Sequence, residues 1–277
     1  MRKVFTCLVM LLSLSAACFA QQQTYQITTT SWHGLSGLYV VPTARSLGRG
    51  QLAMGYNESR HAEFIGNGRF LDRQVRATLT YGISDRVEVS GNYIRDLLTA
   101  GDGFKPVLSN ESFNTFSAKW RVYDETKKRP ALALAVRDVF NDMQDVEPFT
   151  DVNNGTKYFL LATKRLIYKQ DTGRFVDGTI GITKDDQKVA GLFGMEMALS
   201  PNISFIAEGM WDSPYLNFRG IYLQPHNIGT SDHSGRFIFD TGFRIYPDVL
   251  PGFAIDLGFV ADSQPEYSWG FSYVAGL

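Results

Sequence analysis

The stretch from Thr78 to Tyr93 constrains the fold of this chain more than any other. Apolar and polar residues alternate strictly along 75–81, before a tight turn at Ile83–Asp85, and again along 87–93 after it. Successive side chains of a strand point to opposite faces, so this hairpin has one apolar and one polar face. In a soluble sandwich the apolar face would line a core. In an outer-membrane barrel it would meet lipid, and the polar face would line the lumen.

The amino terminus predicts export. Arg2 and Lys3 precede an apolar run over 4–17, and Cys18-Phe-Ala20 places small residues where a signal peptidase cleaves. The run is too short and wrongly flanked for a spanning helix, so residues 1–20 are expected to be a cleaved signal peptide. A second possible cleavage, before Cys18, resembles a lipoprotein box and leaves lipidation open.

Composition narrows the class of protein. The chain has two cysteines, Cys7 and Cys18, and both lie in the expected leader, so the mature chain has no thiols. This suits a barrel that crosses the periplasm unfolded, although a soluble secreted domain of this size need not use disulfides either. The net charge of −1 argues against nucleic acid as a partner. After Ala20, no apolar run approaches the roughly 20 residues of a membrane helix.

The rest of the chain is predicted to be β-structure with about twelve strands. Most of them are long enough to cross a bilayer at a tilt, which takes roughly 9–11 residues, whereas soluble strands more often run about 5–6. The expected strands are 50–57, 74–82, 86–95, 114–123, 131–138, 156–168, 175–183, 189–199, 203–211, 236–246, 252–262 and 267–276.

The connections between these strands alternate in length. Short turns separate longer connections, which are expected at 58–73, 96–113, 139–155 and 212–235, although two connections on the long side are short. Outer-membrane barrels combine short periplasmic turns, long outer loops and an even strand number. We therefore predict an all-β, antiparallel up-and-down transmembrane barrel over 49–277 in the cell outer membrane, surrounded by its lipid. Residues 21–48 would precede it as a lead-in or a small periplasmic plug.

A motif near the amino terminus resembles a known family. It consists of Gly34, Gly37, Pro42, Thr43, Ala44, Gly50, Gly55 and Tyr56. This pattern is similar to the start of YjbH-like proteins, outer-membrane barrels associated with exopolysaccharide and capsule loci. The resemblance covers about the first third of the mature chain. It implies a role in polysaccharide export or secretion, with the polysaccharide and export-machinery proteins as partners.

The same motif has a physical interpretation. Pro42 fixes φ and removes a backbone donor, which disfavours a central strand through it, and the glycines permit tight bends or close backbone approach. Residues 31–48 would then form a plug in the periplasmic mouth or pack beneath the barrel rim. Both alternatives remain open from the sequence.

The polar parity of the strands predicts which charged side chains line the lumen. Early strands contribute mostly basic residues and later strands mostly acidic ones, so a wet pore would carry a transverse field, whereas a tight barrel would be closed by ion pairs. Twelve strands lie between filled barrels of about 8 and open ones of about 16–18. The predicted lumen residues are Arg76, Glu88, Lys119, Arg121, Arg137, Asp177, Glu196, Glu208, Asp240, Arg244 and Asp256.

Catalytic and metal-binding patterns are weak. Ser231-Asp-His-Ser234 is the only suggestive cluster, but adjacent residues of an extended chain point apart, and a triad needs groups converging from different segments. The oxygen-rich loops 151–155 and 183–186 lack calcium-loop spacing. We expect no enzyme, and no catalytic, metal or cofactor site.

The connection 212–235 is the most distinctive outer loop. Tyr215, Phe218 and Tyr222 give it aromatic surface, and long loops in compact domains are usually functional or disordered. We hypothesise that these residues contact the polymer, the alternative being that the loop's apolar residues anchor it to the rim. The function predicted first is therefore an accessory in exopolysaccharide or capsule export. The alternatives are a small porin-like channel, a non-conducting structural barrel and, last, a lipid-modifying enzyme.

Overall fold

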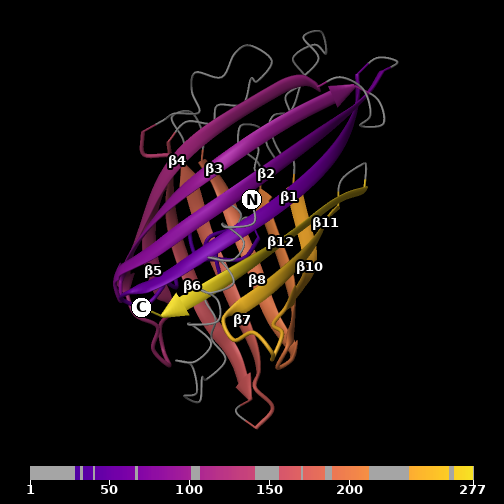
Figure 1. Ribbon diagram of the computed structural model, residues 1–277. Helices are drawn as coiled ribbons and strands as arrows, with labels where there is room; N and C mark the ends of the chain where they lie inside the picture. Colours follow the sequence, from indigo (N-terminus) through magenta and orange to yellow (C-terminus); the bar gives the residue numbers. More distant parts are fainter. Residues whose placement is uncertain are drawn as a thin grey trace.

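Twelve antiparallel strands form one closed barrel in which each strand pairs with its sequence neighbours and β12 closes onto β1 (Figure 1). This computed structural model describes residues 29–31, 34–39, 41–65, 68–100, 107–140, 156–169, 171–184, 189–211, 237–261 and 265–276. The predicted antiparallel barrel is confirmed, while the expected signal peptide lies outside the described residues. The strands are β1 (Gln51–Ile65), β2 (Gly68–Ser84), β3 (Val87–Ala100), β4 (Val107–Tyr123), β5 (Ala131–Arg137), β6 (Lys157–Lys169), β7 (Arg174–Lys184), β8 (Val189–Ser200), β9 (Ile203–Trp211), β10 (Phe237–Ile245), β11 (Phe253–Ala261) and β12 (Pro265–Gly276).

The β2–β3 hairpin shows how sequence alternation sorts side chains between the two surfaces. Thr80 pairs with Ser90 and Leu79 with Gly91. Thr80 and Ser90 are buried inside the barrel, whereas Leu79 is 50% exposed on the outer wall. Because register fixes every side chain to one face, the same pattern continues around the ring.

The first four strands are longer than the sequence indicated. We expected long connections at 58–73 and 96–113, but β1 and β2 stay paired as far as Ile65 and Gly68, and β3 and β4 stay paired beyond Leu97. Both expectations were wrong. The sequence of these segments does not alternate strictly between apolar and polar residues, yet backbone hydrogen bonds between neighbouring strands do not require such alternation.

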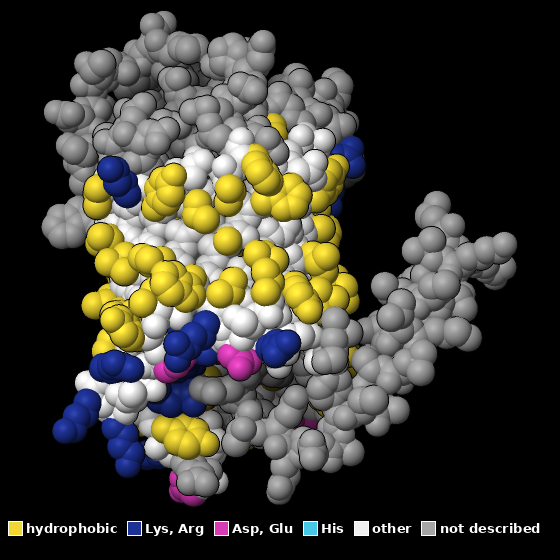
Figure 2. Space-filling view, turned by 90° about the vertical axis from the view of Figure 1, so that its left-hand side faces the viewer, with side chains coloured by type: hydrophobic (Ala, Val, Ile, Leu, Met, Phe, Trp, Pro, Cys, Tyr) yellow, Lys and Arg dark blue, Asp and Glu magenta, His cyan; other side chains and the backbone are white. Residues whose placement is uncertain are grey.

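The outer wall carries a broad band of exposed hydrophobic side chains, one side of which is visible in Figure 2. Aromatic rings pack against one another within it, such as Tyr56 on Phe271 with centroids 5.4 Å apart and Phe205 on Phe243 at 5.7 Å. Exposed members include Tyr93, Phe116, Trp120, Leu134, Leu160, Ile180, Leu257, Phe259 and Trp269. Soluble monomers rarely expose contiguous apolar patches beyond a few hundred Å², so this band is a lipid-facing surface. Among the described residues, no helix is long and apolar enough to span a membrane.

The inside of the barrel contains the chain's own amino-terminal segment. Its described residues, 29–31, 34–39 and 41–48, are here called the lumen segment. Tyr39, Ala44 and Leu47 are completely buried, although they precede the first strand. The hydrophobic core of the molecule therefore lies in the lumen, between this segment and the barrel wall.

Candidate functional site

The lumen segment folds back on itself as it crosses the barrel. Isolated bridges join Thr30 to Ser36 and Gly37 to Pro42, and the Leu38 amide donates to the Val41 carbonyl at 3.0 Å. These internal bonds satisfy part of the backbone that would otherwise be buried without partners. The remaining polar groups are satisfied by inward-facing side chains from several strands.

On one side, Glu88 of β3 is the centre of a buried polar cluster. Its carboxylate accepts hydrogen bonds from the Ser36 amide at 2.8 Å, the Ser36 hydroxyl and the Leu47 amide at 2.9 Å. Lys119 of β4 pairs with Glu88 at 2.9 Å and donates to the Ser36 carbonyl at 2.8 Å. Both charged side chains are fully buried. Such a buried pair is stable only when hydrogen bonds satisfy its remaining donors and acceptors. The lumen segment supplies these hydrogen bonds.

On the opposite side, Arg244 of β10 holds the bend of the segment. Its guanidinium pairs with Asp256 of β11 at 2.7 Å and donates to the Gly37 carbonyl at 3.3 Å. The same guanidinium lies 5.8 Å from the centroid of the Tyr39 ring. The Tyr39 hydroxyl donates to the Leu257 carbonyl at 3.1 Å, so that ring is fixed at both its face and its tip.

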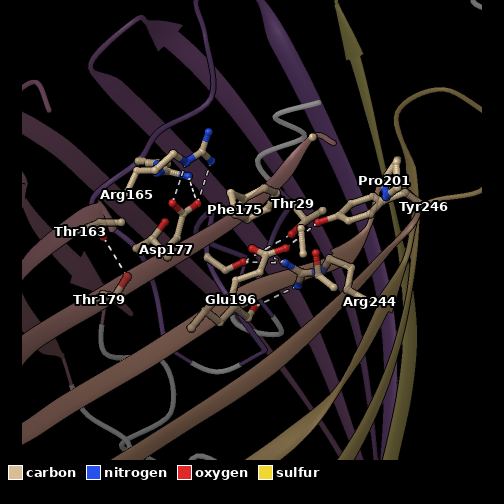
Figure 3. A pocket seen from close by; sticks show the side chains of 17 residues that line it. Thr29, Thr163, Arg165, Phe175, Asp177, Thr179, Glu196, Pro201, Arg244 and Tyr246 are labelled. Carbon is tan, nitrogen blue, oxygen red and sulfur yellow. Dashed lines mark hydrogen bonds and ion pairs between the residues drawn. The ribbon is translucent and has the colours of Figure 1, made fainter. Parts of the chain in front are cut away.

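Strands β6, β7 and β9 complete the attachment. The Ala44 amide donates to the Thr163 hydroxyl at 2.8 Å, and the Val41 amide donates to Glu208 at 3.1 Å. Arg45 forms a short ion pair with Asp177, which also pairs with Arg165 at 2.8 Å (Figure 3). The segment is thus bonded to walls on all sides of the ring.

An apolar cluster fills the remaining space between the segment and the β5–β9 side. From the segment it includes Leu35, Leu38, Tyr39, Val41 and Ala44. The wall contributes mainly small side chains from β5, together with larger ones from β6, β8 and β9. These wall residues are Ala131, Ala133, Ala135, Phe159, Leu161, Ala190, Leu192 and Ile206. Small inward residues leave room for the segment, and the resulting contact is packed like a protein interior rather than a wet channel.

A small cavity of about 50 Å³ remains beside the segment at the short-turn end, with room for a few water molecules. Figure 3 shows Arg165, Asp177 and Glu196 on its wall. The Tyr246 hydroxyl donates to Glu196 at 2.8 Å. Burial, and then the neighbouring Glu196 carboxylate, raise the pKa of Tyr246 well above its ordinary value, so it remains a protonated donor.

The structure places the predicted lumen residues on the inner wall. Arg121 and Glu196 are half-buried, and Arg121 lies near the short-turn end, where it pairs with Asp124 at 3.0 Å. The buried members are Arg76, Glu88, Lys119, Arg137, Asp177, Glu208, Asp240, Arg244 and Asp256. Glu88, an acidic residue among the mostly basic early strands, pairs with Lys119, and Arg244, a basic residue among the mostly acidic later strands, pairs with Asp256.

The motif that resembles the YjbH-like start mostly forms the lumen segment and its entry into β1. Gly34 has φ of 91°, and a Cβ there would lie 2.0 Å from the Ser90 hydroxyl oxygen. Gly50 has φ of 77° and donates its amide to the Gly82 carbonyl at 2.8 Å. Gly37 would place a Cβ 2.6 Å from the Val41 carbonyl oxygen. Gly34 is needed because the segment passes close to the wall, Gly37 because the segment folds back on itself, and Gly50 because of its positive φ.

The other motif residues fall into two groups. Pro42, Thr43 and Ala44 are buried in the segment, and a Cβ on Gly55 would lie 2.5 Å from the Thr78 hydroxyl oxygen. Tyr56 lies elsewhere: its ring packs with Trp269, centroids 5.5 Å apart, on the outer wall.

Sequence reasoning missed the apolar part of the inner wall. Ala131, Ala133 and Ala135 alternate with Leu132, Leu134 and Val136, so both faces of β5 read as apolar. The size alternation was the available signal, because the small residues point inward toward the segment and the large ones point outward. Tyr215, Phe218 and Tyr222, the hypothesised polymer contacts, lie outside the described residues. Within the described part of the chain, no group of three or more His, Cys, Asp or Glu residues could hold a metal ion.

A closed antiparallel ring with an apolar outer band and charged side chains inside is the arrangement of proteins that cross the outer membrane with strands. The sheet closes on itself, since β1 and β12 pair from Gln51–Gly276 to Arg60–Tyr267. The chain is an outer-membrane β-barrel. Because outer-membrane barrels place their short turns on the periplasmic side, we assign the end with the β2–β3, β4–β5, β6–β7, β8–β9 and β10–β11 turns to the periplasm.

Comparison with known proteins adds structural likenesses only. No protein-family model matches the chain, and no curated protein matches it. An outer membrane channel from Pseudomonas putida F1 has 13% identity and a TM-score of 0.46 over 84% of this chain and 97% of that one. The Acinetobacter baumannii outer membrane protein Omp33 has 12% identity and a TM-score of 0.44 over 83% and 100%. The translocator domain of the autotransporter NalP from Neisseria meningitidis has 12% identity and a TM-score of 0.41 over 83% and 90%.

Proposed function

We propose that this protein is a closed outer-membrane barrel that assists export of a surface polysaccharide without passing the polymer through its own lumen. The observation that carries the proposal is the apolar cluster joining the lumen segment to β5, β6, β8 and β9. A wet pore wall does not pack in this way. The cluster therefore favours a non-conducting barrel over a small porin-like channel.

Polar attachment of the segment points in the same direction. Glu88, Arg244 and Asp177 bond to it from three sides of the ring. Withdrawing the segment would leave these buried charges without those partners, which is costly in a low-dielectric interior. The segment is thus a built part of the resting barrel.

The polysaccharide role rests on the resemblance of residues 34–56 to the YjbH-like start. Most of the motif residues have a structural role, since they allow the segment to bend and to pack against the wall. A barrel closed in this way would act through its surface and loops, next to a separate export pore. Export-machinery proteins and the polymer itself are the partners that this role requires.

A reversible lock on the segment tests the route of the polymer. A Cβ on Gly55 of β1 would lie 2.8 Å from the Thr30 hydroxyl oxygen, so Thr30→Cys with Gly55→Cys should form a disulfide. Thr78→Ala makes room for the new Cβ and, alone, serves as the control. Both natural cysteines precede residue 20, so the mature chain contributes no competing thiol.

The proposal predicts two results in cells. A strain without the protein should carry less polysaccharide on its surface, because the polymer is either not exported or not retained. The oxidised, locked variant should restore the polymer as well as its reduced form does. Unchanged polymer in the deletion strain would contradict the polysaccharide role. Restoration only in the reduced form would show that the segment must move and that the lumen is the route.

A further inference from the structure

Basic side chains gather at one sector of the periplasmic rim. They lie just before β1, in the β2–β3 and β4–β5 turns, and around the β6–β7 turn. All are exposed. The group, here called the basic rim, consists of Arg49, Arg86, Lys127, Lys128, Lys169 and Arg174. The other two short turns, 201–202 and 246–252, contain neither Lys nor Arg, so the rim is basic on the β1–β7 side alone.

Most of this positive charge is not neutralised by the protein. Arg86 pairs with Asp124. Within the described residues, the structure has no ion pair to the other members of the basic rim. The nearby acidic groups offset only part of this charge: Glu125 faces Arg45 and Lys164, Asp85 accepts the Arg49 amide at 3.0 Å, and Asp171 is exposed in the β6–β7 turn. Long cationic side chains that are not held in ion pairs within the protein can extend toward anions around the barrel.

The basic rim lies at the edge of the lipid-facing surface. Trp120, Tyr123 and Tyr168 are 52%, 48% and 50% exposed on the adjoining outer wall. The guanidinium of Arg129 stands 5.1 Å from the centroid of the Tyr123 ring. Figure 2 shows Lys and Arg side chains directly beyond the hydrophobic band. Aromatic girdles mark the interface between the hydrocarbon and the headgroups, so these cations are at headgroup level.

We propose that the basic rim binds the headgroup phosphates of anionic glycerophospholipids in the periplasmic leaflet. Ammonium and guanidinium groups near a membrane surface attract anionic lipids, and the aromatic residues beside them place the acyl chains against the wall. The β8–β11 side has no matching cations. The barrel therefore recruits anionic lipid on one side only, which gives it a preferred orientation toward neighbours in the membrane.

Lipid retention in native mass spectrometry tests this site. The full mature protein, in a zwitterionic detergent, is titrated with phosphatidylglycerol and, separately, with phosphatidylcholine. We expect preferential retention of phosphatidylglycerol, and an affinity about thirtyfold lower for Lys127→Ser with Lys128→Ser. Lys127→Arg with Lys128→Arg keeps the charge and should retain the lipid. Lys184→Ser, which removes an exposed cation at the outer end of β7, should also leave retention unchanged.

Three outcomes would overturn the proposal. One is equal retention of the two lipids by the unaltered protein. Another is a double serine variant that binds phosphatidylglycerol as well as the parent does, or a Lys184→Ser variant that loses as much binding as the double serine variant. The third is displacement of the lipid by millimolar inorganic phosphate or by soluble polygalacturonate, which would assign the basic rim to a soluble anion or an anionic polymer. Heat-modifiable migration checks that each variant has folded.

Discussion

Glu88 on the barrel wall holds Ser36 of the lumen segment through both its backbone amide and its hydroxyl. The donor–acceptor distances are 2.8 Å from the amide and 2.8 and 2.9 Å from the hydroxyl to the two carboxylate oxygens. The residues are 52 positions apart in sequence. One acidic side chain thus couples the strand register of β3 to the position of the segment that fills the lumen.

Removing that carboxylate should loosen the segment. In Glu88→Ala, Lys119 remains buried without its counter-ion, a change that typically costs about 3–5 kcal/mol. We expect protease cleavage within 29–48 in the folded barrel, measured by amino-terminal sequencing of the fragments. Ser90→Ala on the same strand is the matched control. It removes a buried hydroxyl that accepts a hydrogen bond from the Thr80 hydroxyl of the wall, and the segment should stay protected.

Glycine at position 34 should be required for seating the segment. Gly34→Ala combines a positive φ with a Cβ 2.0 Å from the Ser90 hydroxyl oxygen, and strain of this kind costs about 1–3 kcal/mol. The expected result is a lower unfolding temperature and faster cleavage of the segment. Gly191→Ala, where nothing lies within 4 Å of the new Cβ, should stay within about 0.5 kcal/mol of the parent. Equal effects of the two substitutions would argue against this close packing.

The two faces of β2 should respond differently to the same substitution. Leu79→Arg puts a charge on the lipid face, which costs about 2–4 kcal/mol near the membrane midplane, and should reduce assembly as measured by heat-modifiable migration. Thr78→Arg would be mild in an empty lumen. Here Thr78 is 5% exposed beside Gly55 and the segment, so we expect it to assemble with the segment displaced. A protected segment in assembled Thr78→Arg would contradict the packing.

Tyr39 separates the polar from the apolar contribution to the lumen core. Tyr39→Phe loses the hydrogen bond to the Leu257 carbonyl and should destabilise the seated segment by about 1 kcal/mol. Tyr39→Ala also empties the centre of the apolar cluster and should cost about 3–5 kcal/mol. Thermal unfolding in detergent measures both variants. Similar losses for the two would show that the ring makes little packing contribution.

Much of the barrel was predictable because alternation is a local property of the sequence. The alternation around Leu79 predicts one lipid-facing and one inward surface, and the register of β2 and β3 agrees with it. The ends of β1 to β4 were not predictable in this way. Apolar and polar residues do not alternate strictly there, and backbone pairing between strands leaves no periodic signal of its own.

The content of the lumen was the harder part. Parity placed Glu88 and Arg244 on the inner wall, but only the folded chain shows that they bond to Ser36 and to the Gly37 carbonyl. Those contacts join positions far apart in sequence. The inward alanines of β5 carried a usable signal in their small size, yet their meaning depends on a partner segment that no local pattern identifies.

Conductance in planar lipid bilayers tests most directly whether the lumen is closed by its own segment. The purified, folded mature protein should insert without stable conductance steps, whereas Glu88→Ala and Tyr39→Ala should show openings as the segment loosens. The variants also demonstrate that insertion has occurred. Large, stable steps from the unaltered protein, equal to those of the variants, would contradict a closed barrel.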